Sequence, residues 1–595
     1  MWRGYAIGVL LLVVPFLVGF VHPTLSHDIK SESPTNSFES SYVPHGPIEI
    51  GSDADFVNQG WPGAGTQENP YLIEGLEIAT TSDCIVVGNT TAFFEVRDCV
   101  LNSTGSTIAG IGFKMVNVTN AQVSSCSFLR KSKGIELSYS NSSIISRNTC
   151  DFNSYGLYCT TSQNLTIKLN TIQNCGWGIT TIDSSNITFN ENTLHGYSTC
   201  GFMASSCQDF NITRNELRDG DYDYLAGDQM ALYGIWNSTL SHNLFVNRLD
   251  YSLVLSGASC VLINNTFLNG GVYPHPGCDL TLIDNKVNGK ILGHLTNLTD
   301  TEIDASSFGQ LFIENCNNTV FRDGNFSSTE IGMMVQDCFN CTFRDLSVIS
   351  CHWEGISISN SPASQVRYCN ISLNRDYGLE ISLSANSTII GNMLVGNQYA
   401  MSVSYSKNSS IKGNTIVGGK IFEYWCDGIR VHGHNYTIYN NSIDDCSTGI
   451  ELHQAYNSTT TKNVITRCPD DGIYCVFTED ATIITNTLFN NGRGIDFHYS
   501  ENCTVSFNNI TTSLYWGVDV DSGSIDLLLY GNYITWNHLE ATDDGIDCQW
   551  DDGVSIGNIW GDYSGEGYYY LPGSAGSIDH YPSRLIDDTP PTIEG

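Results

Sequence analysis

Two positions of a repeated block near the C-terminal end carry side chains that could perform acid–base chemistry. Six blocks open with a glycine, at residues 428, 449, 472, 494, 517 and 545. With this glycine counted as the first residue, the two positions are the third and the fifth, and apolar residues occupy the second and the fourth. Earlier blocks have a small neutral residue at the fifth position, such as Ser138 or Ser382, so the change of residue type marks a candidate site. The third position holds Arg430, Glu451, Tyr474, Asp496, Asp519 and Asp547, and the fifth holds His432, His453, Val476, His498, Asp521 and Gln549.

Stacked carboxyl groups would give this site an acid beside a base. If each block is one rung of a coil, equal positions lie about 4.8 Å apart, and Asp496 lies over Asp519. Like charges so close raise one pKa. The pair matches the carboxyl spacing of about 5 Å in retaining glycosidases, whereas Asp496 and Asp547, two rungs apart, come nearer the spacing in inverting enzymes. His453 and His498 would relay protons or orient the sugar. The predicted catalytic residues are Asp496, His498, Asp519, Asp521, Asp547, Glu451, His453, Arg430 and His432.

Aromatic residues near these blocks predict a sugar-binding surface. An insertion at residues 418–427 carries Tyr424 and Trp425, and a second insertion nearer the C-terminus carries Trp536. Aromatic rings suit the apolar faces of sugars. Together with Tyr474, these three residues are the predicted ligand-binding residues.

A repeat that runs through most of the chain must position these side chains. Its blocks are mostly 21 to 23 residues long, and an asparagine follows each opening glycine by 13 to 15 residues. Segments such as Gly449 to His453 alternate apolar and polar residues, which is typical of a strand with one buried face. A single block cannot bury its own apolar side, so the blocks must stack. The predicted fold is all-β: a right-handed parallel β-helix, a single-stranded solenoid of about twenty coils with three short strands per coil and caps at both ends.

Asparagines form two columns in the blocks. The column that includes Asn170 and Asn463 is predicted to lie at a corner in left-handed backbone and to form a hydrogen-bonded ladder between coils. The other column reads Asn-x-Ser/Thr, and the chain has 21 such sequons. Turn chemistry alone would explain the second column, but its concentration in one corner favours glycosylation. The predicted glycosylation sites are Asn141, Asn164, Asn186, Asn386, Asn408, Asn457 and Asn502.

Composition changes along the chain predict its organisation and its compartment. Arg3 precedes an apolar run from Tyr5 to Val21, which predicts a secretory signal or, alternatively, an uncleaved N-terminal anchor. No other membrane segment is expected, and the protein is predicted to be secreted or at the cell surface. The predicted segments are a signal peptide (1–26), a polar linker (27–47), an N-terminal cap (48–78), the β-helix (79–560), a C-terminal cap (561–586) and a linker to a further module (587–595).

The charge balance limits the partners. With 26 basic and 62 acidic residues, the formal net charge is −36, which disfavours nucleic acid and anionic lipid. A polyuronate would also be repelled unless bound cations compensate. Calcium is the cation that we weighed, since several aspartates lie close together in the sequence from Asp519 to Asp551. A copper site is less consistent with the sequence, which has 8 Met and no His/Met cluster.

The 21 cysteines divide between two expectations. Cys159, Cys475 and Cys548 fall at the inward fourth position of their blocks, where a small apolar residue is expected. Others lie about one block apart near corners, and Cys99 with Cys126 or Cys446 with Cys468 are candidate disulfides.

The terminal segments and the repeat resemble a known family. The segment GWPGAGTQENPYLIEGLEI at 60–78, the repeats and GNIWGDYSGEGY at 557–568 resemble the NosD-like branch of the right-handed β-helix repeat proteins, a group that includes pectate-lyase-like enzymes. Gly494-Ile-Asp-Phe-His498 is similar to the GxDPH motif of alginate C5-epimerases, with Phe497 in place of proline. That resemblance implies that Asp496 and His498 are active-site residues.

Three functions remain open from the sequence. The first is a protein that binds, and cleaves or epimerises, a polysaccharide or cell-surface glycan along the outer face of the first sheet. The second is a non-catalytic spacer or adhesin, and the third is a metal-binding accessory protein for calcium or copper. A spacer has no need of the row of His and Asp residues, whereas exposed strand positions are often polar without any function.

Overall fold

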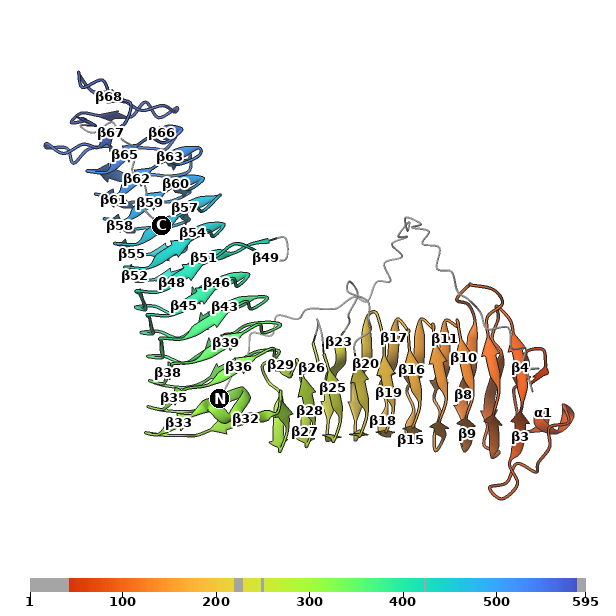
Figure 1. Ribbon diagram of the computed structural model, residues 1–595. Helices are drawn as coiled ribbons and strands as arrows, with labels where there is room; N and C mark the ends of the chain where they lie inside the picture. Colours follow the sequence, from red (N-terminus) through yellow and green to blue (C-terminus); the bar gives the residue numbers. More distant parts are fainter. Residues whose placement is uncertain (1–41, 219–227, 248–250, 422–423, 586–595) are drawn as a thin grey trace, which may run out of the picture. The chain divides into compact units, whose positions relative to one another are not determined.

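A computed structural model describes residues 42–218, 228–247, 251–421 and 424–585. These residues form a right-handed parallel β-helix of about 22 turns, which confirms the predicted fold (Figure 1). The predicted signal peptide and the C-terminal linker lie outside the described residues. Among the described residues, no helix is both long and apolar enough to cross a membrane.

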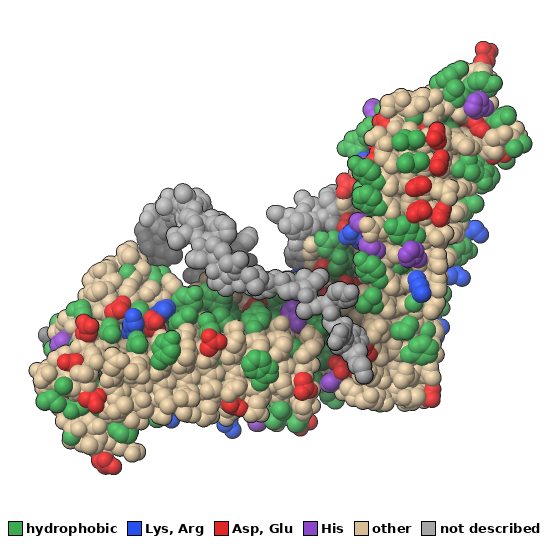
Figure 2. All heavy atoms as spheres, turned by 180° about the vertical axis from the view of Figure 1, so that it is seen from behind, with side chains coloured by type: hydrophobic (Ala, Val, Ile, Leu, Met, Phe, Trp, Pro, Cys, Tyr) green, Lys and Arg blue, Asp and Glu red, His purple; other side chains and the backbone are tan. Residues whose placement is uncertain are grey.

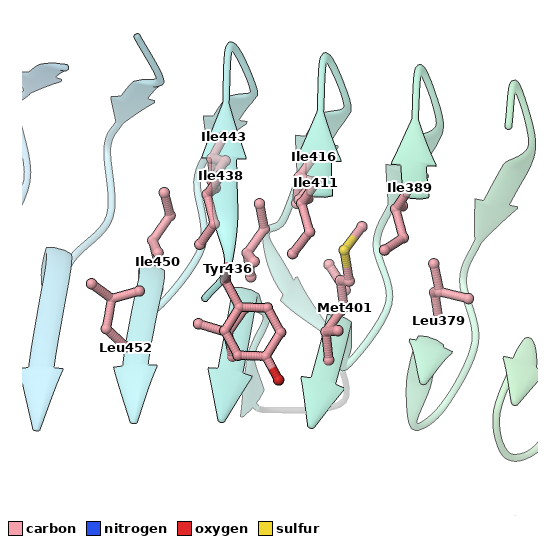
Figure 3. Close-up of a cluster of buried hydrophobic side chains, with 14 of the residues drawn as sticks. Leu379, Ile389, Met401, Ile411, Ile416, Tyr436, Ile438, Ile443, Ile450 and Leu452 are labelled. Atoms are coloured by element: carbon pink, nitrogen blue, oxygen red, sulfur yellow. The ribbon is translucent and has the colours of Figure 1, made fainter. Parts of the chain in front are cut away.

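One coil consists of three short strands joined by tight corners. In a representative coil these are β54 (Thr448–Tyr456), β55 (Thr459–Thr461) and β56 (Val464–Thr466). The inward side chains Ile450 and Leu452 are fully buried, and apolar residues of neighbouring coils stack on them (Figure 3). This alternation turns the residues between them outward, as the sequence pattern predicts.

The first strands of the C-terminal coils belong to one large parallel sheet. Its outer face carries most of the candidate residues. The strands are β34 (Phe308–Glu314), β37 (Met333–Gln336), β40 (Ile356–Ser359), β43 (Tyr377–Ser382), β46 (Tyr399–Ser404), β51 (Asp427–His434), β54, β57 (Asp471–Val476), β60 (Arg493–His498), β63 (Trp516–Val520) and β66 (Leu539–Asp543).

The strand connections change near residue 288. Up to β31 (Lys286–Val287), the first and second strands of each coil share one sheet, and the third strands form another. Then β32 (Lys290–Thr296) pairs antiparallel with β31 and parallel with β34. From there on, the first strands continue the sheet that held the third strands, and the second and third strands form two new sheets.

Two large hydrophobic cores follow these two stretches of coil, and Leu292, Phe312 and Ile331 from the start of the C-terminal stretch pack into the N-terminal core. Side chains of the C-terminal stretch bond to the backbone of the N-terminal one. Gln310 accepts from the N–H of Val272 at 2.9 Å and donates to its carbonyl oxygen at 2.6 Å, and Glu330 accepts from the N–H of Ser252 at 2.6 Å. All these groups are buried, so the bonds satisfy polar atoms that water cannot reach.

A glycine opens most blocks because a side chain there would strike the neighbouring coil. A Cβ atom on Gly449 would lie 2.3 Å from Cγ2 of Ile465 and 2.6 Å from the carbonyl oxygen of Gly472. Only a residue without a side chain fits this close approach.

The buried asparagine column forms the predicted ladder. The N–H and Nδ2 of Asn463 both donate to Oδ1 of Asn486 at 3.0 Å, and Nδ2 also donates to the carbonyl oxygen of Ile438. The predicted left-handed backbone at these asparagines is wrong. The positive φ falls on the preceding residue, such as Lys462 with a φ of 55°, because the corner turns one residue earlier.

The ends of the solenoid carry extra elements. The predicted N-terminal cap contains the whole first coil, and Phe56 of its helix is buried and stacks on Tyr71 with ring centroids 4.6 Å apart. At the other end, Trp560 stacks on Tyr569 at 4.1 Å. These elements are β2 (Ile48–Ile50), α1 (Asp53–Asn58), β3 (Tyr71–Glu74) and β4 (Leu76–Ala79), and then β67 (Ile559–Trp560), the hairpin of β68 (Tyr569–Tyr570) and β69 (Ile578–Asp579), and β70 (Ser583–Arg584).

All 21 cysteines are free thiols, and 19 of them are buried. Neither candidate disulfide is present, and Cys446 Sγ lies 3.9 Å from Cys426 Sγ instead. Cys159 and Cys475 are fully buried, as predicted. The inward placement of Cys548 is wrong, because this residue is only partly buried at a corner near the last coil.

Candidate functional site

Strand register places the predicted row on one face of the first-strand sheet. Arg430 pairs with Glu451, Glu451 with Tyr474, Tyr474 with Asp496, and Asp496 with Asp519. We call the outer face of β51, β54, β57, β60 and β63 the site face. Acidic, histidine and basic side chains gather on one side of the C-terminal coils in Figure 2.

The fifth-position row is also in register. His432 pairs with His453, His453 with Val476, and Val476 with His498. Asp521 follows β63, and its Oδ2 lies 3.7 Å from His498 Nδ1.

The predicted end of both rows is wrong. In the first-strand sheet, β63 pairs with β66. There Thr542 pairs with Asp519, and Glu540 occupies the position of the opening glycine. Asp547 lies instead in a corner with a φ of 55°, and Gln549 bridges to Leu528 of a second strand. The glycine at 545 misled the prediction, because the position that opens this block holds Glu540 instead of a glycine. The wider carboxyl pair of Asp496 and Asp547 is therefore not formed.

A third row, which the sequence reasoning missed, precedes the glycines. Thr448 pairs with Asp471, and Asp471 pairs with Arg493. Asp427 occupies the same position two coils before Asp471. The alternating pattern starts at the glycine, so it gave no reason to read the preceding residue. The sequence did hold an indication of this row, because three blocks of the region have Asp or Arg directly before the opening glycine.

Five residues of these rows form the Asp496 cluster: Asp471, Arg493, Asp496, His498 and Asp519. The side chain of Asp496 is 1% exposed, and its Oδ2 lies 2.9 Å from Arg493 Nη1 and 3.3 Å from His498 Nε2. Neither carboxyl oxygen of Asp496 has a well-aligned hydrogen-bond partner. Arg493 Nε donates to Asp471 at 2.7 Å, and Arg493 Nη1 lies 3.8 Å from Asp519.

The electrostatics of the Asp496 cluster favour proton exchange near neutral pH. Burial raises the pKa of Asp496 to about 7, and the pKa of Asp471 also to about 7, although Arg493 opposes both changes. Burial also raises the pKa of Asp519. The Arg493 side chain is 29% exposed and that of His498 is 37% exposed, so these two present the cluster to solvent.

A second cluster lies on the neighbouring coils of the site face. His453 Nδ1 is 3.1 Å from Glu451 Oε1, and Arg430 Nε is 3.4 Å from the same oxygen. The rings of His432 and His453 stack with centroids 5.3 Å apart. Burial, and then the neighbouring His453, lower the pKa of His432, so this ring is biased towards the neutral form.

Exposed aromatic rings at the corner beside the fifth-position row were also missed. Phe477 and Tyr499 stack with centroids 5.4 Å apart, and their exposed fractions are 48% and 60%. A third exposed ring, that of Tyr405, is separated from Phe477 by two coils of the site face. Tyr405 is 61% exposed, and its ring centroid lies 4.5 Å from that of His432. These corner positions have positive φ, where bulky residues are uncommon. The presence of aromatic residues at such corners could therefore have indicated this surface from the sequence.

The predicted aromatic ligands differ in outcome. Tyr474 lies on the site face, edge-on to His498 at 5.5 Å. Trp536 packs against Tyr533, an outward residue of the third strand of its coil, at 5.9 Å. Tyr424 and Trp425 form strand β50 (Tyr424–Trp425), and their side chains lie outside the described residues.

The seven sequon asparagines share one corner at the solvent-facing side of the coil. Six of them have positive φ, and Asn141 is followed by Ser142 with a φ of 49°. Their amides form an outer ladder, in which Asn164 Nδ2 donates to Asn141 at 2.8 Å and Asn186 Nδ2 donates to Asn164 at 2.6 Å. Turn chemistry accounts for these contacts, and glycosylation stays a prediction.

Among the described residues, no group of three or more His, Cys, Asp or Glu side chains is arranged to hold a metal ion. Of the aspartates weighed for calcium, Asp543 accepts bonds from Trp550 Nε1 and Ser577 Oγ at 2.7 Å each, and Asp551 accepts from His580. Calcium binding stays a prediction.

A family model described as "Periplasmic copper-binding protein (NosD)" matches residues 79–274 and 398–565. The chain belongs to the NosD family. A second model, described as a right-handed β-helix region, matches residues 277–416. The family description names copper, but the described residues do not fit a copper site of His, Cys or carboxylate ligands, because no three such side chains come together and nearly all thiols are buried.

Several solved structures are similar to this chain at low sequence identity. The alginate lyase from Paenibacillus sp. str. FPU-7 is 11% identical, with 41% of this chain and 99% of that chain covered and a TM-score of 0.24. PfbA, a surface adhesin of Streptococcus pneumoniae, is 10% identical, with 66% and 86% covered and a TM-score of 0.26. The periplasmic alginate epimerase AlgG is 13% identical, with 67% and 85% covered and a TM-score of 0.24. No curated protein matches the chain.

Proposed function

We propose that this protein is secreted or held at the cell surface and binds a polysaccharide along the site face. His498, positioned by the buried Asp496, transfers a proton at the bound sugar. The observation that carries this proposal is the contact of the half-exposed His498 with a buried carboxyl group at 3.3 Å, next to Asp519.

The burial of Asp496 decides its role. A carboxyl group whose side chain is 1% exposed cannot reach a sugar, so Asp496 is a positioning residue rather than the acid of a glycosidase pair. It orients His498 and stabilises the protonated imidazole, as a buried carboxylate does beside a catalytic histidine. Asp519 and Asp521, each with a side chain 21% exposed, are the accessible carboxyl groups. Glycosidic cleavage and epimerisation both need proton transfer of this kind.

Aromatic and polar groups on the same face support sugar binding. The stacked pair of Phe477 and Tyr499 offers ring faces to the apolar side of a sugar, and Tyr474 and Arg430 offer hydrogen-bond donors. Because the strands are in register, these groups recur about every 4.8 Å along the sheet, which suits an extended chain rather than a compact ligand.

A polysaccharide screen with product detection tests the proposal. Reducing-end release, absorbance of unsaturated sugars and NMR of the products separate cleavage, elimination and epimerisation. We expect His498→Ala to lower the turnover rate by about 100-fold or more while binding persists, and Phe477→Ala to weaken binding about tenfold. His195→Ala, on a third strand of an N-terminal coil, is the matched control.

Two outcomes would decide against parts of the proposal. Binding without turnover on any glycan would leave a non-catalytic adhesin or spacer. No binding to any glycan on an array would refute the proposal altogether.

A further inference from the structure

An acidic and aromatic cluster lies earlier on the same sheet, outside the site face. Its carboxyl groups are Glu354, just before β40, Asp376, just before β43, and Glu380 within β43. Its rings are Tyr251 and Trp353, with centroids 5.5 Å apart, together with Tyr273. We call these six residues the Glu354 cluster.

The three rings form a compact triangle. Tyr251 and Tyr273 lie 5.8 Å apart, and Tyr273 meets Trp353 nearly edge-on at 5.9 Å. Each ring is only partly buried, so ring surface remains open to a ligand. Two of these rings come from the N-terminal stretch of coil and the third from the C-terminal stretch.

A buried carboxyl oxygen without a partner points to a ligand at this place. Glu354 is 7% exposed, and its Oε2 has no hydrogen-bond partner. Such an atom costs free energy unless something binds it. Glu380, in contrast, accepts a hydrogen bond from Ser357 at 3.3 Å.

The charges here favour a cation. Burial, followed by repulsion from Glu380 and Asp376, raises the pKa of Glu354 to about 8, and burial with repulsion from Glu380 raises that of Asp376 to about 6. Basic side chains near the cluster include Arg375, which has an interaction partner, and Arg430, whose charge is felt by Tyr377. The ring of His275 lies 5.2 Å from that of Tyr273, and His352, next to Trp353, lies 3.7 Å from Glu330. A bound cation would relieve the repulsion, and aromatic rings beside it would add cation–π attraction.

We propose that the Glu354 cluster binds an amino sugar of a glycan that carries free amino groups, with the ammonium group on Glu354 and Asp376 and the sugar ring on the aromatic triangle. This inference rests on the proposed function, since the glycan is the one that the site face binds. Six rungs separate β40 from β60, which is about 29 Å at about 4.8 Å per rung. The amino sugar would thus anchor the chain several sugars away from His498. A cationic glycan also matches the net charge of −36.

Calorimetry on the full chain with three probes tests this inference. The probes are a glucosamine oligomer, its fully N-acetylated counterpart and spermine. We expect the glucosamine oligomer to bind, the acetylated oligomer to bind at least about tenfold more weakly, and spermine to compete poorly because it cannot stack as a sugar ring does. Binding should release protons at about pH 6, where the amino groups of the oligomer are already charged and the bound cation favours the ionised form of Glu354.

Variants separate this site from the site face. Glu354→Gln and Asp376→Asn should each weaken binding of the glucosamine oligomer about tenfold or more. Glu354→Gln should also abolish part of the proton release. Asp284→Asn, an exposed carboxyl at a corner of an N-terminal coil, should change nothing. If Glu354→Gln fails to fold, Asp376→Asn at a half-buried position still provides the test.

The outcomes distinguish the two proposals. Equal binding of both oligomers, or equal losses in Asp284→Asn and Glu354→Gln, would overturn the amino-sugar site while the proposed function stands. Loss of turnover in His498→Ala with unchanged binding of the glucosamine oligomer supports both. Spermine binding as tight as that of the oligomer would overturn the assignment of a sugar.

Discussion

Replacing Asp496 by asparagine should make the stability of the protein less sensitive to pH. Burial raises the pKa of Asp496 from 3.8 to about 7, so the folded protein binds this proton more tightly than the unfolded chain does. A group with a raised pKa contributes stability that is complete below the unfolded pKa and is lost as the pH rises through about 7. The difference between the two pKa values corresponds to roughly 4 kcal/mol at alkaline pH.

Asparagine cannot ionise, so Asp496→Asn removes this loss. We expect the free energy of unfolding of the variant, relative to the unmodified protein, to rise by about 2–3 kcal/mol between pH 5 and pH 9. The lower end of that range allows for Arg493 and His498, which lose an ionised partner in the variant. The same substitution should abolish turnover, because His498 loses the group that orients it.

Urea denaturation at pH 5, 7 and 9 measures the effect. Asp552→Asn is the control that should show no dependence on pH over this range, since three backbone N–H groups lower the pKa of Asp552 from 3.8 and its contribution is lost only at pH values below those of the assay. If the unmodified protein and Asp496→Asn show the same dependence on pH, the buried carboxyl group is not the acid that we describe. An equal loss of stability at all three pH values would point instead to its contacts with Arg493 and His498.

Three further predictions concern the scaffold. Asn463→Ala should lower the free energy of unfolding by about 2–4 kcal/mol, because Ile438 O and the buried N–H groups of Asn441, the preceding ladder asparagine, lose their partner; an unchanged denaturation midpoint would argue against the ladder. Gly449→Ala should destabilise by about 1–3 kcal/mol, because its Cβ would meet backbone and side-chain atoms below 3 Å, and a shift no larger than that of an exposed alanine substitution would contradict this. Thiol titration of the native protein should label only Cys278 and Cys548, since the other cysteines are buried; rapid labelling of many thiols would show that the coils open readily.

The repeat made most of the fold predictable from the sequence. Each stacked position keeps one kind of residue, so the glycine at the head of a block and the ladder asparagine report the period directly. The same stacking predicted the neighbours of Asp496 and His498, because side chains in register need no further information. Chemical roles do not follow from strand register alone.

The sequence did not predict features that depart from the repeat. The last coil has Glu540 where a glycine was expected, so the sequence analysis wrongly placed the start of this block at Gly545. Asp471 precedes the alternating segment, and its partnership with Arg493 depends on how the corner turns. The Glu354 cluster joins Tyr251 to Trp353 across about a hundred residues, at the place where β32 changes the sheet that a first strand joins.

The division of the interior into two cores has a consequence for cooperativity. In a stacked array each coil is stabilised by its immediate neighbours, so an interruption of the apolar column uncouples what lies on either side. Where Gln310 and Glu330 join the stretches, polar bonds take the place of some of that apolar contact. Heating should therefore melt the array in two steps rather than one, with one stretch of coil still folded after the other has opened.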